Sequence, residues 1–406
     1  MRAAHDDAFE FPYIALDHPA IQYAAPATHN VISRLQEKIG KGQVKLDYDA
    51  RYGYLPSLLK NLDIPRDSQM LVFSRTSFQG PKISPQHPRA IYFSDQAAVG
   101  FVPQGDVMEL AAVDSEKGVV FYTLDLDKAP KPEFVRPKME CIQCHVYPGT
   151  LNLPGLTVTS VIPTPDGTPR FPASAITVDS RTAFESRWGG WYVTGTSGTL
   201  QHRGNAVAPF ADRPSVLDYR GNQNLTSLKG RVDTSAYLEP SSDIIALMTI
   251  EHQTRATDLL VRLAWETRIA AKEGKLDDFR NGRLNLLADQ VVRYLLFADE
   301  AKLYEPVTGV STFVKTFPER GPRDPHGRSL RDFDLQTRLF RYPLSFMIYS
   351  PVFDALPDLA KERVYQGLFS ALTKENGGFA NLSATDRRAI YEIVRDTRTG
   401  LPDYWK

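Results

Sequence analysis

The sequence predicts an α+β protein whose strands and helices are separated along the chain. In the first 240 residues, short apolar runs recur at intervals of roughly ten residues, which is the pattern of an antiparallel strand meander. After Pro240, apolar residues at helical spacing dominate. We therefore divide the chain into a strand- and loop-rich region, residues 1–240, and a helical region, residues 241–406, that packs on it. No long flexible linker separates the two regions, so one continuous domain is an equally valid division.

The first region begins with an extended arm, residues 1–29, which three prolines interrupt. A helix is predicted over residues 31–40, because Asn30 is a suitable N-cap and apolar residues recur every four positions. A second, short helix is predicted over residues 56–62, with proline in its first turn. The predicted strands follow as residues 70–73, 90–93, 98–102, 108–113, 119–124 and 157–162.

The second region is predicted to consist of helices and connecting loops. A long helix begins after Ser241 or Ser242, either of which can cap it, and ends at Gly274. The last helix has the spacing of a capping box at Ser383 and Asp386. The other helices predicted from apolar spacing are residues 283–303, 334–341, 346–354 and 358–372, and the last helix spans residues 383–398.

Composition excludes several classes of protein. Lysine plus arginine equals aspartate plus glutamate, at 48 residues each, so the charge balance does not favour nucleic acid as a partner. No run of about 18 apolar residues occurs, and we expect no transmembrane segment. The N-terminus has no apolar stretch of the signal-peptide type. Because the chain contains 29 prolines and only two cysteines, it fits an exported protein that disulfides do not hold together.

The two cysteines form the most specific motif in the chain, Cys141-Ile-Gln-Cys144-His145. This is the attachment signature of a c-type haem, in which two thiols form thioethers with the haem vinyl groups. The adjacent imidazole of His145 then coordinates the iron. A structural zinc site normally needs four ligands, and no second cysteine pair exists. A redox dithiol would begin a helix, whereas loop-forming residues 146–149 follow here, and a disulfide within the motif is uncommon. The sequence thus predicts one covalent haem c, attached in a loop of the first region.

A second unusual stretch, residues 187–195, places two tryptophans around paired glycines. Trp188 and Trp191 are candidates for contact with the porphyrin face, and the alternative is an aromatic core with a glycine bend. Arg187 and Arg203, together with Arg136, are candidate partners of the haem propionates, because a guanidinium binds a carboxylate in a bidentate manner. The alternative for each arginine is a solvated surface position.

The sixth iron ligand decides between an electron carrier and an enzyme. His252 lies on the apolar stripe of the predicted long helix, where it is either an iron ligand or a hydrogen-bonded core histidine. His202 is a candidate distal acid–base group or propionate partner, and its alternative is an exposed loop residue. Three methionines are further candidates that can equally be core residues, namely Met108, Met139 and Met248.

Several stretches together resemble a family of uncharacterised bacterial single-haem cytochrome c domain proteins. The motif and the tryptophan–glycine stretch carry most of this resemblance, and the further matching stretches are residues 68–74, 327–332 and 340–343. The resemblance covers most of the chain and implies an exported protein with one haem. It implies no particular reaction.

Two functions from different classes remain open at this point. The first is a periplasmic electron-transfer protein with a six-coordinate haem, whose ligands are His145 and His252. The second is a haem enzyme of the peroxidase or oxidase type, or a sensor of gaseous ligands, with an open distal position. A carrier needs about a hundred residues, so the length of 406 residues favours an enzyme mildly. The expected partner is a redox protein or a small-molecule oxidant or reductant.

Overall fold

The computed structural model describes residues 10–137, 140–170, 175–209, 216–277, 279–374 and 378–406. A six-stranded antiparallel sheet lies at its centre, and each strand pairs with its neighbour in the sequence. These strands are β1 (Met70–Val72), β2 (Arg89–Phe93), β3 (Ala97–Phe101), β4 (Val107–Asp114), β5 (Gly118–Asp125) and β6 (Phe134–Val135). A separate antiparallel pair consists of β7 (Val158–Ser160) and β8 (Ile176–Val178). The mixed sheet-and-helix architecture and the meander are confirmed, while β6 and β8 are strands that the sequence pattern did not predict.

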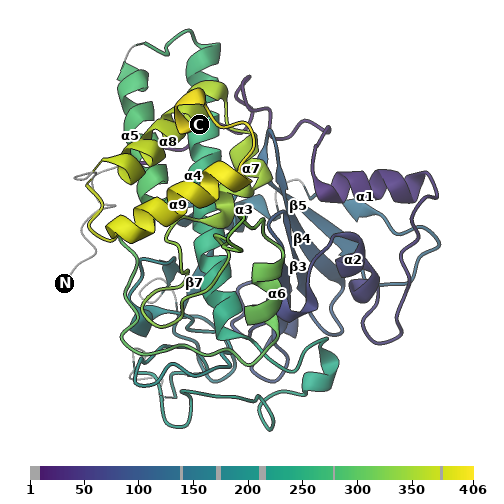
Figure 1. The fold of residues 1–406 in the computed structure, drawn as a ribbon. Helices are drawn as coiled ribbons and strands as arrows, with labels where there is room; N and C mark the ends of the chain where they lie inside the picture. The colour runs from purple at the N-terminus through teal and green to yellow at the C-terminus, as the bar shows by residue number, and fades with distance from the viewer. Residues whose placement is uncertain (1–9, 138–139, 171–174, 210–215, 278, 375–377) are drawn as a thin grey trace.

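Helices cover both faces of the large sheet. Figure 1 shows α1 and α2 on one side of the sheet, α4 on the other side, and α5, α8 and α9 beyond α4. The helices are α1 (Val31–Gly40), α2 (Leu55–Asn61), α3 (Ile142–His145), α4 (Ile244–Lys272), α5 (Phe279–Leu295), α6 (Phe313–Glu319), α7 (Pro351–Asp354), α8 (Asp358–Thr373) and α9 (Ala384–Thr397). Short 3₁₀ segments connect them, namely η1 (Arg66–Ser68), η2 (Gly80–Lys82), η3 (Pro148–Thr150), η4 (Phe184–Ser186), η5 (Thr234–Ala236), η6 (Phe346–Tyr349) and η7 (Asp403–Trp405).

Helix α4 lies between the sheet and the C-terminal helices, and nearly all of its residues are buried. Neither predicted serine caps it. Instead, the side chain of Asp243 accepts a hydrogen bond from the amide of Ile245 at 2.8 Å. The hydroxyl of Ser242 does not cap the helix, because it accepts a hydrogen bond from the amide of Leu71 and donates one to the carbonyl of Tyr192. The start of α4 is thereby fastened to β1 and to the tryptophan–glycine stretch.

Several of the predicted helices are confirmed, and others need correction. The helix predicted over residues 346–354 is divided at Ser350 into η6 and α7. No helix forms over residues 334–341, because the side chain of Asp334 accepts from the amides of Gln336 and Thr337 at 2.8 and 2.7 Å. These bonds satisfy the backbone donors within a tight turn and compete with helix formation. The helix predicted over residues 283–303 begins and ends earlier, as α5, and α6 was not predicted.

A single large hydrophobic cluster contains side chains from both predicted regions, from Ile14 near the N-terminus to Trp405 near the C-terminus. It includes the apolar faces of the sheet, of α4 and of the helices α5, α8 and α9. Among the helices that the structure describes, none has the length and apolar composition needed to cross a membrane.

Candidate functional site

The two cysteines and the histidine of the motif share one helical turn. The amide of His145 donates to the carbonyl of Cys141 at 3.0 Å, which closes the single turn of α3. The motif, predicted to lie in a loop, is therefore helical, although the backbone becomes extended directly afterwards at Val146. Cys141 is half-buried, Cys144 is exposed, and both are free cysteines. One turn of helix thus presents both thiols beside the imidazole.

The imidazole of His145 is held from two sides. Its Nδ1 lies 2.9 Å from the carbonyl oxygen of Gly155, whose own amide donates to the carbonyl of His145 at 3.1 Å. The ring of Phe121 on β5 lies against the imidazole, with the ring centroids 4.5 Å apart. Burial lowers the pKa of His145, so the ring is neutral at pH 7 with its proton on Nδ1. In the described part of the chain, Nε2 has no hydrogen-bond partner, and its lone pair is available to a metal.

A half-buried ion pair lies on the sheet beside the motif. Glu109 of β4 is 2.5 Å from Arg89 of β2, and it also accepts hydrogen bonds from Ser77 and Gln79 at 2.5 and 2.9 Å. Burial raises the pKa of the Cys141 thiol to about 11, and the negative charge of Glu109 adds to this effect. This pair was not predicted, although Glu109 is the only charged residue within the apolar run of residues 108–113 and could have indicated it.

The tryptophan–glycine stretch packs against backbone. The carbonyl of Gly190 accepts from the amide of Phe73, and the amide of Tyr192 donates to the carbonyl of Leu71, both at 2.9 Å. At Gly189, an added Cβ would lie 1.9 Å from the carbonyl oxygen of Val161, so no other residue fits there. The glycines therefore let two backbone segments approach each other. This packing matches the aromatic core with a glycine bend, the second of the two sequence interpretations.

The predicted haem neighbours in this stretch have partners inside the protein. The guanidinium of Arg187 forms a buried ion pair with Glu251 of α4, and it also donates to the carbonyls of Thr182 and Ser180 at 2.9 and 3.1 Å. The indole nitrogen of Trp188 donates to the same carboxylate at 3.0 Å. Burial raises the pKa of Glu251, and the charge of Arg187 and the bond from Trp188 oppose this shift. Each guanidinium nitrogen of Arg187 thus has an acceptor inside the protein, and the side chain is 3% exposed, so it is directed into the core.

Trp191 likewise belongs to the core. Only 5% of it is exposed, and its indole nitrogen donates to the carbonyl of Thr159 on β7 at 2.9 Å. Arg203 is half-buried, its amide donates to the carbonyl of Arg187 at 3.0 Å, and its charge lowers the pKa of Tyr219, which burial raises. The structure does not bring these side chains into contact with the motif.

His252 occupies an aromatic cage between α4 and α5. Its ring is fully buried and stacks on Tyr294, with centroids 5.0 Å apart, and on Phe297, with centroids 4.3 Å apart. Its Nε2 lies 2.7 Å from the hydroxyl of Ser345. Residues Ile250, Gln253, Thr254 and Thr257 line the small space between α4 and the sheet, which places His252 on the opposite face of this helix. The structure does not bring His252 to the motif, and its setting is that of a core histidine.

The remaining candidates are dispersed. His202, expected at the surface or at the haem, is buried against Trp188 and Phe184, and this burial lowers its pKa to about 4. Arg136 donates to the carbonyls of Tyr23 and Ala25. Met108 is fully buried and alternates with Glu109, so it points to the other face of the sheet. Met248 is buried one turn before His252 on α4, and Met139 lies outside the described residues.

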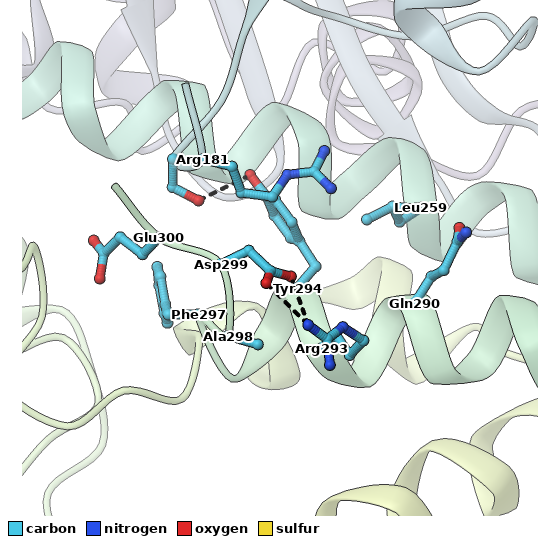
Figure 2. A pocket seen from close by; sticks show the side chains of 10 residues that line it. Arg181, Leu259, Gln290, Arg293, Tyr294, Phe297, Ala298, Asp299 and Glu300 are labelled. Atoms are coloured by element: carbon cyan, nitrogen blue, oxygen red, sulfur yellow. Dashed lines mark hydrogen bonds and ion pairs between the residues drawn. The ribbon is translucent and has the colours of Figure 1, made fainter. Parts of the chain in front are cut away.

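A cavity of about 180 Å³ lies between α4, α5 and the segment after β8. Figure 2 shows its lining, in which Arg181 lies over the ring of Tyr294 and Arg293 forms two contacts with Asp299 at 2.9 and 3.0 Å. Arg181 is itself paired with Asp179 at 2.7 Å. The sequence analysis did not predict this cavity. Its two arginines are each paired with a neighbouring aspartate, and Glu300, whose pKa burial raises to about 7, also lines it.

The donor set of the motif fits a covalent haem. Within the described residues, no group of three or more histidine, cysteine, aspartate or glutamate side chains could hold a bare metal ion. A haem brings four ring nitrogens of its own and needs only thiols for attachment and an axial ligand from the protein. The turn at Cys141, Cys144 and His145 supplies all three groups. Comparison of the chain with protein-family models, curated proteins and solved structures finds no match.

Proposed function

We propose that this chain is an exported monohaem c-type cytochrome with a redox function. In this proposal, Cys141 and Cys144 attach one haem through thioethers, and Nε2 of His145 is the axial ligand of its iron. The observation that carries the proposal is the single helical turn in which two accessible thiols flank an imidazole with an anchored Nδ1 and an available Nε2. Export is part of the proposal, because haem c is attached outside the cytoplasm.

The protein's own residues would set the properties of such a haem. A bound haem c supplies reversible one-electron chemistry. The carbonyl of Gly155 fixes the tautomer of His145 and raises its strength as a ligand. Phe121 restricts rotation of the imidazole, and the half-buried pair of Glu109 and Arg89 places fixed charges beside the site. The expected partner is a redox protein or a small-molecule oxidant or reductant.

A second candidate function is a haem enzyme or a gas sensor with an open distal position. The observation that favours it is the placement of the expected sixth ligands. His252 and His202 are buried in aromatic surroundings, while Met108 and Met248 lie on faces of β4 and α4 directed away from the motif. Among the candidates that the structure describes, none lies beside His145. This arrangement favours a ligand-exchangeable iron over the six-coordinate carrier.

The experiment that tests the proposal is haem staining of the full chain after export to a periplasm that contains the haem-attachment machinery. We expect covalent stain on a denaturing gel for the wild type. The stain should be absent from the double variant C141S/C144S, because no thiol remains to form a thioether. The wild-type chain retained in the cytoplasm is the matched control and should be unstained. A wild type without stain after export, or a stained double variant, would refute the proposal.

The optical spectrum then separates the two candidate functions. A closed, six-coordinate iron gives sharp ferrous bands that carbon monoxide does not change, which is the behaviour of an electron carrier. An open site gives a high-spin spectrum that shifts on addition of the gas. On the placement of His252 and His202 we expect the shift, and peroxide turnover would be the next assay.

A further inference from the structure

A single peptide group links the proximal histidine to the long helix. The carbonyl of Gly155, which accepts from Nδ1 of His145, belongs to the same peptide plane as the amide of Leu156. That amide donates to the carboxyl group of Asp258 on α4. The three groups therefore form one continuous chain of hydrogen bonds, from the carboxyl group through the peptide to the imidazole.

Asp258 is buried, and the amide of Leu156 is its main hydrogen-bond donor in the described part of the chain. It is 1% exposed, and its Oδ2 has no hydrogen-bond partner in the described part of the chain, so Oδ1 is the atom that accepts from Leu156. An added Cβ at Gly155 would lie 2.3 Å from this Oδ1, and only glycine allows the peptide so close to the carboxyl group. Burial raises the pKa of Asp258 well above its usual range, because the charged carboxylate is poorly solvated there.

Hydrogen bonds at the two ends of a peptide group reinforce each other. When the amide of Leu156 donates to Asp258, the peptide is polarised and the carbonyl of Gly155 becomes a stronger acceptor for His145. The same contact fixes the orientation of the peptide plane, and with it the direction from which Nδ1 is held. A group that orients a metal-binding imidazole through its second nitrogen normally contributes to metal affinity.

We propose that Asp258 is a positioning residue for His145, which it holds in the Nδ1–H tautomer by orienting the peptide group between Gly155 and Leu156. This inference rests on the proposed function where it concerns iron, because the tautomer leaves Nε2 as the ligating nitrogen. The tautomer itself is a property of the chain without haem and can be measured separately.

The test compares three variants of the full chain. D258N keeps an oxygen that accepts from Leu156, whereas D258L has similar volume and no acceptor. T267V is the matched control, because Thr267 is another buried polar residue of α4 whose hydroxyl bonds only to the carbonyl of Leu263. Should D258L fail to fold, D258A removes the same acceptor without adding bulk.

The first readout is the ratio of Nδ1–H to Nε2–H tautomers of His145, measured by ¹⁵N NMR on protein produced without haem. We expect D258L to lower this ratio by up to about fivefold, because the complete loss of one hydrogen bond of ordinary strength sets the upper bound. D258N and T267V should keep the wild-type ratio. An unchanged ratio in folded D258L or D258A, or a lowered ratio in D258N, would overturn the inference.

The second readout is the iron–histidine stretching frequency of the exported, haem-loaded protein by resonance Raman. It should fall in D258L and stay at the wild-type value in D258N and T267V, because only D258L weakens the bond to Nδ1. A wild type that binds no haem would refute the proposed function and leave the tautomer result standing. A haem-loaded D258L with the wild-type frequency would refute the role of Asp258 toward iron alone.

Discussion

Two histidines, the half-buried His145 and the fully buried His252, invite comparison because the sequence marked both as iron ligands. Each has one ring nitrogen engaged, His145 through Nδ1 to Gly155 at 2.9 Å and His252 through Nε2 to Ser345 at 2.7 Å. Each also lies against aromatic rings. They differ in their surroundings, since His145 shares a helical turn with two free cysteines and His252 is fully enclosed by the core.

The comparison shows that burial, aromatic contacts and one hydrogen bond do not distinguish a ligand from a core residue. The two kinds of histidine are distinguished by the surroundings of the ring nitrogen that forms no hydrogen bond within the protein. His145 keeps Nε2, the atom at the end of the ring, beside two thiols that can attach a cofactor. His252 has its Nε2 occupied and its ring stacked on Tyr294 and Phe297, so a ligand could reach it only after the cage has opened.

The largest expected effect comes from removing each histidine in turn from the exported protein. H145A should lose the axial ligand, and the ferrous spectrum should change completely or the haem should fail to attach. H252A should leave the optical spectrum unchanged, because His252 contacts no part of the motif. Absorption spectra of both oxidation states, normalised to the covalently bound haem, provide the measurement.

The opposite result would reverse the comparison. If H252A alters the ferrous bands while H145A leaves them intact, the core histidine is the ligand and the cage must open in the haem-bound protein. H202A extends the series, because His202 is the other buried histidine that the sequence proposed for the distal side.

Much of the fold could be predicted from local signals. The side chain of Asn30 caps α1, and Ser383 with Asp386 forms a capping box on α9, as their spacing predicted. Where prediction failed, a side chain satisfied the backbone in another way. Asp334 closed a tight turn where apolar spacing predicted a helix, and Asp243 capped α4 in place of a serine that β1 had already engaged.

The candidate site could be predicted only where its residues are adjacent in the sequence. The spacing of Cys141, Cys144 and His145 marks the attachment turn without knowledge of the fold. Phe121 of β5 contacts His145, and Asp258 of α4 accepts from Leu156 next to the site. Local sequence patterns do not predict such long-range contacts. The prediction that the tryptophan–glycine stretch contacts the porphyrin also depended on neighbours that are distant in the sequence. The paired glycines indicate that the backbone lies close to another group, but they do not identify that group. In the structure it is the backbone carbonyl of Val161.

A second prediction sharpens the contrast between the motif and the packed region around α4. Replacing Arg187 with methionine leaves the buried carboxylate of Glu251 without its ionic partner, which typically destabilises a protein by about 3–5 kcal/mol. The haem spectrum should not change, because the guanidinium of Arg187 is buried and directed to Glu251 and to two backbone carbonyls. Urea unfolding followed by circular dichroism measures the first quantity.

The matched control for this substitution is R203M. Arg203 is half-buried and lies outside the ion pair, so its loss should change the free energy of unfolding by no more than about 0.5 kcal/mol. An R187M variant with wild-type stability and an altered haem spectrum would restore the propionate role that the sequence suggested for Arg187.

The third prediction is a pH dependence of the free energy of unfolding to which the enclosed His252 contributes. Burial lowers the pKa of His252 to about 3, and the charge of Asp179 only partly offsets this. Between about pH 6.5 and pH 3, His252 is therefore protonated in the unfolded chain and neutral in the folded chain. The wild type should lose about 1.4 kcal/mol of stability per pH unit from this site as the pH falls through that range.

The variant H252F isolates this contribution, because phenylalanine fills the aromatic cage and does not titrate. Other buried groups, among them Glu251 and Glu300, are present in both proteins and cancel in the difference. The unfolding free energy of H252F minus that of the wild type should therefore rise as the pH falls below 6.5, whatever constant offset the lost bond to Ser345 adds. H87F, at an exposed histidine, separates the loss of a buried imidazole from the loss of any imidazole. A difference that does not vary with pH would show that His252 is accessible to protons in the folded protein. His252 would then share the accessibility that separates His145 from the core.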